Sequence, residues 1–202
     1  MKHIVIIGAS VAGLAAARTI QALSGIRLTI VESTSDFPPY DPPRLSKEGL
    51  FDGSSLLPDT ARLQFSPGSN TVVLSGVAAT GLDPDIKIIH LSDGRSIHYD
   101  KLVIATGGRA RQWPGANPGP NIGYLRSHED MTALLGMLRE GSSLTIVGAG
   151  LIGCEVAAAA RGHGNAVSVI DGSSRIMSRV AHPELILVDP AGIAACQGDL
   201  LG

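Results

Sequence analysis

Two glycine-rich segments, 140 residues apart, constrain the fold of this chain more than any other feature. One runs from Gly8 to Gly13 with the sequence Gly-Ala-Ser-Val-Ala-Gly, and the other runs from Gly148 to Gly153 with the sequence Gly-Ala-Gly-Leu-Ile-Gly. Glycines at this spacing permit a tight turn after a strand, a close approach of backbone to a pyrophosphate and close packing of the next helix. The chain therefore has two candidate dinucleotide-binding loops.

The same pattern of apolar strand, Ala-rich helix and second apolar strand surrounds both loops. Each pattern ends in an acid, Glu32 in the first and Asp171 in the second. An acid at this position can accept hydrogen bonds from a ribose 2′-hydroxyl, and it disfavours the 2′-phosphate of NADP. The expected elements are residues 3–7, 11–24 and 26–31 around the first loop, and residues 142–147, 151–161 and 166–170 around the second.

The chain between the two loops divides into three stretches. Residues 36–47 contain too many prolines for a helix or strand and are expected to form a functional loop. Residues 70–105 hold three short strand-like runs, which predict a small meander that returns to the sheet. Residues 107–123 are rich in glycine and proline, as expected for a crossover between two lobes.

Composition excludes several classes of function. The 16 Lys and Arg residues are scattered, and only 3% of residues are aromatic, which argues against nucleic-acid binding. No export or membrane segment is expected, because the first apolar run has only about five residues before glycine. The two cysteines, Cys154 and Cys196, match no metal-binding or CxxC spacing, so we expect no metal site and a reducing, cytoplasmic setting.

Three further segments carry a resemblance to a known family. They are residues 40–47 (Tyr-Asp-Pro-Pro-Arg-Leu-Ser-Lys), residues 100–109 (Asp-Lys-Leu-Val-Ile-Ala-Thr-Gly-Gly-Arg) and residues 124–130 (Tyr-Leu-Arg-Ser-His-Glu-Asp). With the two glycine loops, and in the same order, they resemble the FAD-dependent ferredoxin and rubredoxin reductases of oxygenase and cytochrome P450 systems. The resemblance extends from residue 1 to about residue 184.

The resemblance implies an α/β architecture and a function. It implies a Rossmann-like, three-layer FAD-binding domain over residues 1–110, a partial NAD-binding domain over residues 111–184 and a tail over residues 185–202. It also implies two cofactors, FAD and NADH, and an iron–sulfur ferredoxin or rubredoxin as the electron acceptor. Because the NAD lobe is expected to be short, its exposed strand edges would allow a homodimer.

The resemblance further implies roles for individual residues. Lys47, near the isoalloxazine, and Glu155, facing the nicotinamide, would be the catalytic residues, although a surface carboxylate is an equally good interpretation of Glu155. Ser10 stands where the family pattern has glycine, and its Cβ narrows the approach of the phosphate. The residues expected at the FAD are Gly8, Ser10, Gly13, Glu32, Arg44, Lys47, Ala79, Thr106, Gly107, Arg126 and Asp199, and those expected at the NADH are Gly148, Gly150, Ile152, Gly153 and Asp171.

The sequence departs from the family pattern in ways that leave alternatives open. Pro42 stands where the family has arginine, and Arg44 stands where it has proline. We expect no counterpart of the family's interface domain within these 202 residues, and residues 193–199 resemble a later FAD-contacting segment that ends in Asp199. A non-catalytic nucleotide-binding remnant is therefore the alternative to a working reductase. Residues 39–47 lack a cysteine, which argues against a dithiol relay and against an NADH oxidase.

Overall fold

The described part of the chain forms two compact units, which we treat separately. The first unit comprises the described residues up to Arg109, and the second comprises those from Ala110 onward. None of the helices in this part of the chain has the length and apolar content needed to cross a bilayer. The computed structural model describes residues 1–35, 37, 39, 62–115, 119–139, 141–173 and 175–178.

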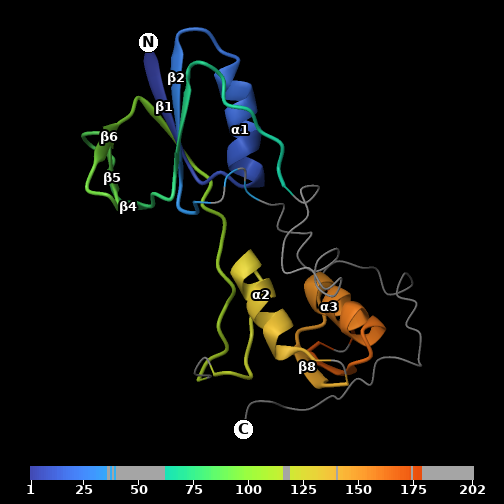
Figure 1. Ribbon diagram of the computed structural model, residues 1–202. Coiled ribbons are helices and arrows are strands. Elements are labelled where there is room, and N and C mark those ends of the chain that lie inside the picture. The colour runs from blue at the N-terminus through green and yellow to red at the C-terminus, as the bar shows by residue number, and fades with distance from the viewer. Residues whose placement is uncertain are drawn as a thin grey trace. The chain divides into compact units, whose positions relative to one another are not determined.

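A parallel four-stranded sheet forms the centre of the first unit (Figure 1). The strand order is β3-β2-β1-β7, and each neighbouring pair is parallel. Crossovers between the strands bring the carboxyl ends of all four to one edge, the edge at which α/β proteins bind ligands. The strands are β1 (Lys2–Ile7), β2 (Ile26–Glu32), β3 (Thr71–Ser75) and β7 (Lys101–Ile104).

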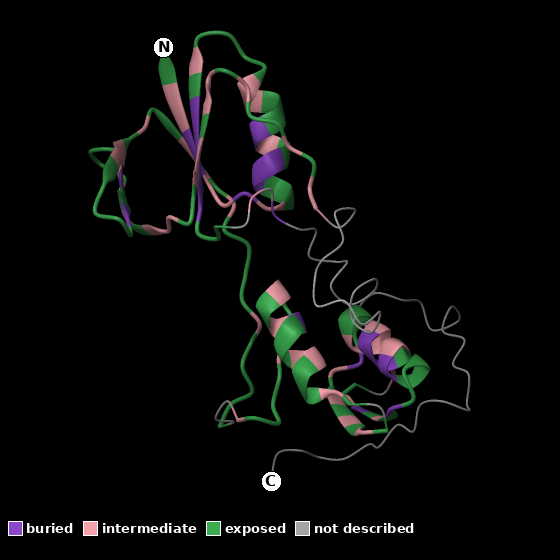
Figure 2. Ribbon diagram, in the orientation of Figure 1, coloured by how far each residue is buried: buried purple, intermediate pink, exposed green. Residues whose placement is uncertain are grey.

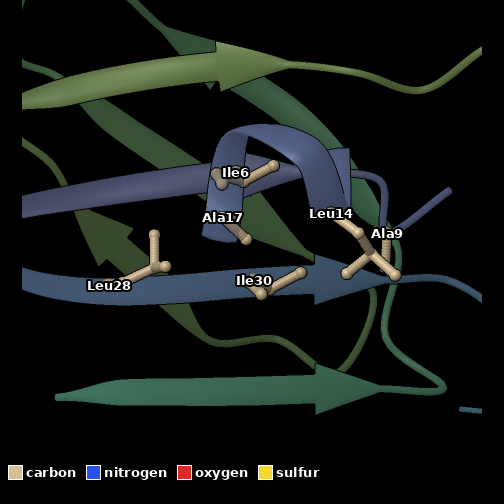
Figure 3. Close-up of a cluster of buried hydrophobic side chains, with 6 residues drawn as sticks. All are labelled: Ile6, Ala9, Leu14, Ala17, Leu28 and Ile30. Carbon is tan, nitrogen blue, oxygen red and sulfur yellow. The ribbon is translucent and has the colours of Figure 1, made fainter. Parts of the chain in front are cut away.

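Helix α1 (Val11–Gln21) covers one face of this sheet. Its alanines favour the helix, and its apolar residues return at helical spacing to face the sheet. Leu14 and Ala17 of the helix pack against Ile6, Leu28 and Ile30 of the strands, and all five side chains are fully buried (Figure 3). Burial of each large side chain in this cluster stabilises the unit by about 1.5–3 kcal/mol.

An antiparallel meander covers the opposite face of the sheet. It consists of β4 (Ala79–Asp83), β5 (Ile88–Leu91) and β6 (Ser96–His98). Ile89 and Leu91 of the meander pack against Val5 and Val31, which point away from α1. The meander, sheet and helix make three layers, which confirms the Rossmann-like α/β fold expected for the first unit.

The expected meander differs from the observed one at its start. Residues 71–74 were expected to belong to it, but β3 pairs in parallel with β2 and extends the main sheet. β5 begins at Ile88 because residues 84–87 form a turn, in which the Asp83 carboxylate accepts hydrogen bonds from the amides of Asp85 and Ile86. The short runs that form β4 and β6 contain few apolar residues and were not expected as strands.

The second unit repeats the strand–helix–strand arrangement on a smaller scale. β8 (Ser143–Val147) and β9 (Ala166–Ile170) are parallel, and α3 (Leu151–Gly162) connects them. Helix α2 (His128–Met137) precedes β8 and was not expected from the sequence. Ala149, Ala157 and Val169 form a small buried cluster, whereas β8 alternates between exposed and partly buried residues (Figure 2).

Candidate functional site: two glycine-rich loops

The first loop connects the end of β1 to the start of α1 at the carboxyl edge of the main sheet. The Gly8 amide donates to the Val31 carbonyl at 2.8 Å, which fixes the turn beside β2. Gly8 has a φ of +96°, a conformation that residues with a Cβ rarely adopt. A Cβ on Gly13 would overlap the Gly8 carbonyl oxygen, so glycine there lets the helix start against the turn.

The end of β7 lies directly beside this loop. A Cβ on Gly8 would overlap the Ala105 carbonyl oxygen and would lie 3.1 Å from the Thr106 nitrogen. Gly107 follows with a φ of +71°. The structure thus brings Thr106, which the sequence predicted at the FAD, against Gly8, although the two are almost 100 residues apart in the chain.

Glu32 at the end of β2 is a buried acid that contacts the loop. Its side chain is only 8% exposed. Oε2 accepts a hydrogen bond from the Ala9 amide at 2.7 Å, and Oε1 accepts one from the Thr34 amide at 3.0 Å. The hydroxyls of Ser33 and Thr34 also donate to Oε1. The acid predicted to bind ribose therefore lies against the middle of the glycine loop.

The second loop has the same local geometry. The Gly148 amide donates to the Ile170 carbonyl at 2.7 Å, and Gly148 has a φ of +112°. A Cβ on Gly153 would overlap the Gly148 carbonyl oxygen, as at Gly13 in the first loop. Asp171 follows β9 and accepts a hydrogen bond from the Ala149 amide on Oδ2 at 2.6 Å. The turn, the close approach of the last glycine and the bond from the acid therefore each have a counterpart in the second loop.

The second loop differs from the first in its surroundings. Apart from Gly148 itself and its two chain neighbours, no residue in the described part of the chain comes within 4 Å of a Cβ on Gly148. Leu151 and Ile152, in the first turn of α3, are each 52% exposed, and Glu155 is half-buried one turn further along. Met177 returns to the loop, since its amide donates to the Ala149 carbonyl at 2.7 Å.

Helices α1 and α3, which follow the two loops, both begin without a capping side chain. Ser10 and Gly150 occupy the N-cap positions of α1 and α3 with nearly the same backbone, φ −79° and ψ −162° for Ser10 against φ −79° and ψ −173° for Gly150. This extended conformation is open to any residue, so Ser10 leaves the loop shape unchanged. Neither residue makes a side-chain cap hydrogen bond. The first amides of a helix lack intrahelical partners and favour anions such as phosphates.

Several residues predicted at the sites are not placed by these observations. Arg44, Lys47 and Asp199 lie outside the described residues, so their roles stay predictions. Ala79 begins β4 and packs in the cluster between sheet and meander. Arg126 is exposed before α2, and its amide donates to the Asp130 carboxylate at 2.9 Å. Gly107, Ile152 and Glu155 lie near their loops, and their roles toward a cofactor also stay predictions.

Cys154 packs behind the second loop. Its thiol donates to the Ala149 carbonyl with a sulfur–oxygen distance of 3.6 Å. Burial, and then the nearby Asp171 carboxylate, raise the pKa of this thiol. A raised pKa leaves little thiolate at neutral pH, and the thiolate is the reactive form. These contacts favour a packing role for Cys154 over that of a reactive thiol.

Sequence reasoning missed two features of these sites. One is the capping box of α2, in which the Ser127 hydroxyl accepts from the Asp130 amide and the Asp130 carboxylate accepts from the Ser127 amide. The spacing Ser-x-x-Asp was a usable signal for it. The other is the bond from the acid of each unit to its loop, which depends on how the chain turns and has no sequence signature of its own.

The fold and the two loops define a class of protein with two dinucleotide-binding strand–helix–strand units. Comparison with protein families identifies the class more closely, because residues 2–187 match the pyridine nucleotide-disulphide oxidoreductase family model. The chain belongs to this family.

Relatives of known activity are similar to most of the chain. A ferredoxin–NAD(+) reductase subunit of a benzene 1,2-dioxygenase system from Pseudomonas putida is 36% identical over 183 residues, which are 89% of this chain and 44% of the relative. A rubredoxin–NAD(+) reductase from Pseudomonas putida is 36% identical over 189 residues, 89% of this chain and 47% of the relative. The chain therefore spans less than half the length of these relatives.

A solved structure is also similar to most of this chain, and the chain again covers about half of it. The covalent complex of putidaredoxin reductase with putidaredoxin contains a chain that matches with a TM-score of 0.80 and 30% sequence identity. The match covers 96% of this chain and 49% of the other. The fold of the described residues is thus that of roughly half of a reductase subunit.

Proposed function

We propose that the chain is the dinucleotide-binding part of a flavoprotein reductase that takes electrons from NADH and delivers them to a small iron–sulfur protein. The observation that carries the proposal is the pair of like loops, each with an acid against it and a helix start free of a capping side chain. The names of the similar proteins support a ferredoxin or a rubredoxin as the acceptor.

We assign FAD to residues 1–110 and NADH to residues 111–184, with residues 185–202 as a tail. The first unit fits FAD because Gly8 and Gly13 let the start of α1 pack closely against the turn after β1, and the first amides of α1 are suited to a pyrophosphate. Glu32 faces the loop from the end of β2, in reach of the adenosine ribose. When bound, FAD accepts hydride from NADH and releases electrons one at a time.

The second unit fits NADH better than NADPH. Asp171 accepts from the Ala149 amide and stands where a ribose 2′-hydroxyl would donate. A 2′-phosphate there would bring a negative charge against the carboxylate. Glu155 would orient the nicotinamide and Lys47 would stabilise negative charge at the flavin. We also assign the protein to the cytoplasm, where a free thiol such as Cys154 persists.

An anaerobic titration followed by absorption spectroscopy tests the proposal. The purified chain is mixed with FAD, passed through a desalting column and titrated with NADH. We expect a yellow protein whose flavin absorbance near 450 nm falls on addition of about one equivalent of NADH. A colourless protein after FAD addition would contradict the proposal. A yellow protein that NADH does not bleach would support the alternative, a nucleotide-binding remnant without hydride transfer.

A further inference from the structure

The acid of each unit accepts a hydrogen bond from its glycine loop. The distance from the Ala9 nitrogen to Glu32 Oε2 is 2.7 Å, and that from the Ala149 nitrogen to Asp171 Oδ2 is 2.6 Å. Glutamate and aspartate differ in length by one methylene, yet each reaches the amide that follows the first glycine of its loop. The same bond thus occurs twice with two different side chains.

The second oxygen of each acid also accepts from a backbone amide. Thr34 donates to Glu32 Oε1 at 3.0 Å, and Ser173 donates to Asp171 Oδ1 at 2.7 Å. A carboxylate can accept at both oxygens, whereas a primary amide can accept at only one. Glutamine or asparagine would place an NH₂ group against a backbone N–H, whichever way it turned. Only an acid at these positions can therefore accept from both backbone amides, whether or not a ribose is bound.

We propose that Glu32 and Asp171 are positioning residues for the phosphate as well as ligands of the ribose. Each acid holds the loop in its dinucleotide-accepting conformation through the amide of Ala9 or Ala149. The inference rests on the proposed function, because it assigns a second role within the same two sites. Ala9 is fully buried and Glu32 nearly so, and a charge-assisted hydrogen bond is strong in such surroundings.

The two roles of the acid predict different responses to ligand. If Glu32 bound only the ribose, its replacement would weaken FAD but would not affect an analogue that lacks the ribose hydroxyls. If Glu32 also holds the loop, its replacement lowers the fraction of chains that can accept a phosphate, and the analogue loses affinity as well. An FAD analogue with 2′,3′-dideoxyadenosine separates the two roles.

The binding test compares FAD and this analogue on the full chain, with flavin fluorescence as the readout. We expect Glu32→Gln to weaken the analogue about tenfold, and FAD by at least that factor, because a buried acid that bonds two amides is replaced by a neutral side chain that can accept from only one. Thr34→Val is the matched control, because it removes the 3.2 Å hydroxyl contact to Oε1 and leaves the Ala9 bond in place. It is expected to change neither affinity. Should Glu32→Gln not fold, Asp171→Asn repeats the comparison with NADH and its dideoxyadenosine analogue.

Hydrogen exchange of the ligand-free, ¹⁵N-labelled chain gives a second readout. We expect Glu32→Gln to speed exchange of the Ala9 amide about tenfold, with little change at the Gly8 amide, which is bonded to Val31. Equal acceleration at both amides would mean general destabilisation and would overturn the inference. So would unchanged affinity of the variant for the dideoxy analogue. Failure of the wild-type chain to bind FAD at all would instead overturn the proposed function, and the exchange result would still decide the role of the acid.

Discussion

The two glycine loops share their internal geometry and differ in what surrounds them. In both, the first glycine has a positive φ, its amide bonds to the neighbouring strand, and the last glycine lies against the carbonyl of the first. The Gly8 loop, however, lies between β2 and β7. In the described residues, the Gly148 loop has β9 as its single neighbouring strand.

Burial shows the same difference. Val5 and Ile6 in β1 are fully buried between α1 and the meander, whereas Val147 at the end of β8 is 56% exposed. The loop conformation therefore follows from the local order of glycines, strand and helix. The core that supports the loop comes from strands that join from elsewhere in the chain. The complete glycine pattern thus predicts the conformation of a loop. The strands beside the loop determine how stable that conformation is.

The largest expected effect tests what the two loops share. Gly13→Ala and Gly153→Ala would each push a methyl group into a backbone carbonyl, Gly8 in one unit and Gly148 in the other. We expect each substitution to lower the free energy of unfolding of its own unit by about 3 kcal/mol, since the backbone cannot easily shift. Hydrogen exchange at the amides of β1 and β8 measures each unit separately. A mild effect in one unit alone would contradict the claim that the two loops share this close contact.

The next effect tests what the loops do not share. Gly8→Ala and Gly148→Ala both place alanine at positive φ, which costs about 1–2 kcal/mol. Gly8→Ala also overlaps the Ala105 carbonyl, whereas a methyl group on Gly148 meets no described atom. We expect Gly8→Ala to cost about 1 kcal/mol more than Gly148→Ala, measured by the same exchange experiment. Equal costs at the two positions would contradict the different surroundings.

A smaller effect separates two serines at helix starts. The Ser127 hydroxyl caps α2, whereas the Ser10 hydroxyl makes no cap bond to α1. Ser127→Ala is expected to lower the free energy of unfolding of the second unit by about 1 kcal/mol. Ser10→Ala is expected to leave the ligand-free first unit unchanged within about 0.3 kcal/mol. Chemical denaturation followed by circular dichroism measures both, and a comparable loss at Ser10 would show that it does cap its helix.

The smallest effect concerns pH. His3 is the second residue of β1 and lies five residues before Gly8, and Ser143 lies five residues before Gly148 in β8. Burial and the Arg27 guanidinium lower the pKa of His3, while a hydrogen bond with the His98 backbone and the negative charge of Asp100 oppose the shift. Between this lowered pKa and about 6.5, the unfolded chain binds more protons than the folded one. Stability of the first unit should therefore be full above about pH 6.5 and fall as the pH drops through the pKa of folded His3.

Urea denaturation between pH 8 and pH 5 measures this dependence. His3→Ser copies the residue at the matching position of the second unit. It should remove the contribution of His3 to the pH dependence of the stability of the first unit. Arg27→Gln should reduce it, because the guanidinium is one of the two causes that lower the pKa. An identical pH profile for His3→Ser and the wild-type chain would rule out this contribution.

The sequence predicted the strand–helix–strand units well, because their signals are local. The ends of β1 and β2 and the start of α1 came within one or two residues of expectation. The position of β3 could not be read in the same way, since a short apolar run suits a meander and a parallel sheet equally. The contact between Gly8 and Ala105 likewise depends on a strand that returns much later in the chain. The bonds from Glu32 and Asp171 to their loops required the folded geometry.

Hydrogen–deuterium exchange with each dinucleotide alone tests most directly the claim that two like loops hold two different cofactors. The exchange of the full chain is measured without ligand, with FAD and with NADH. We expect FAD to slow exchange at residues 8–14 and to leave residues 148–154 unchanged, and we expect NADH to do the reverse. Protection of both loops by one dinucleotide, or of neither loop by FAD, would contradict it.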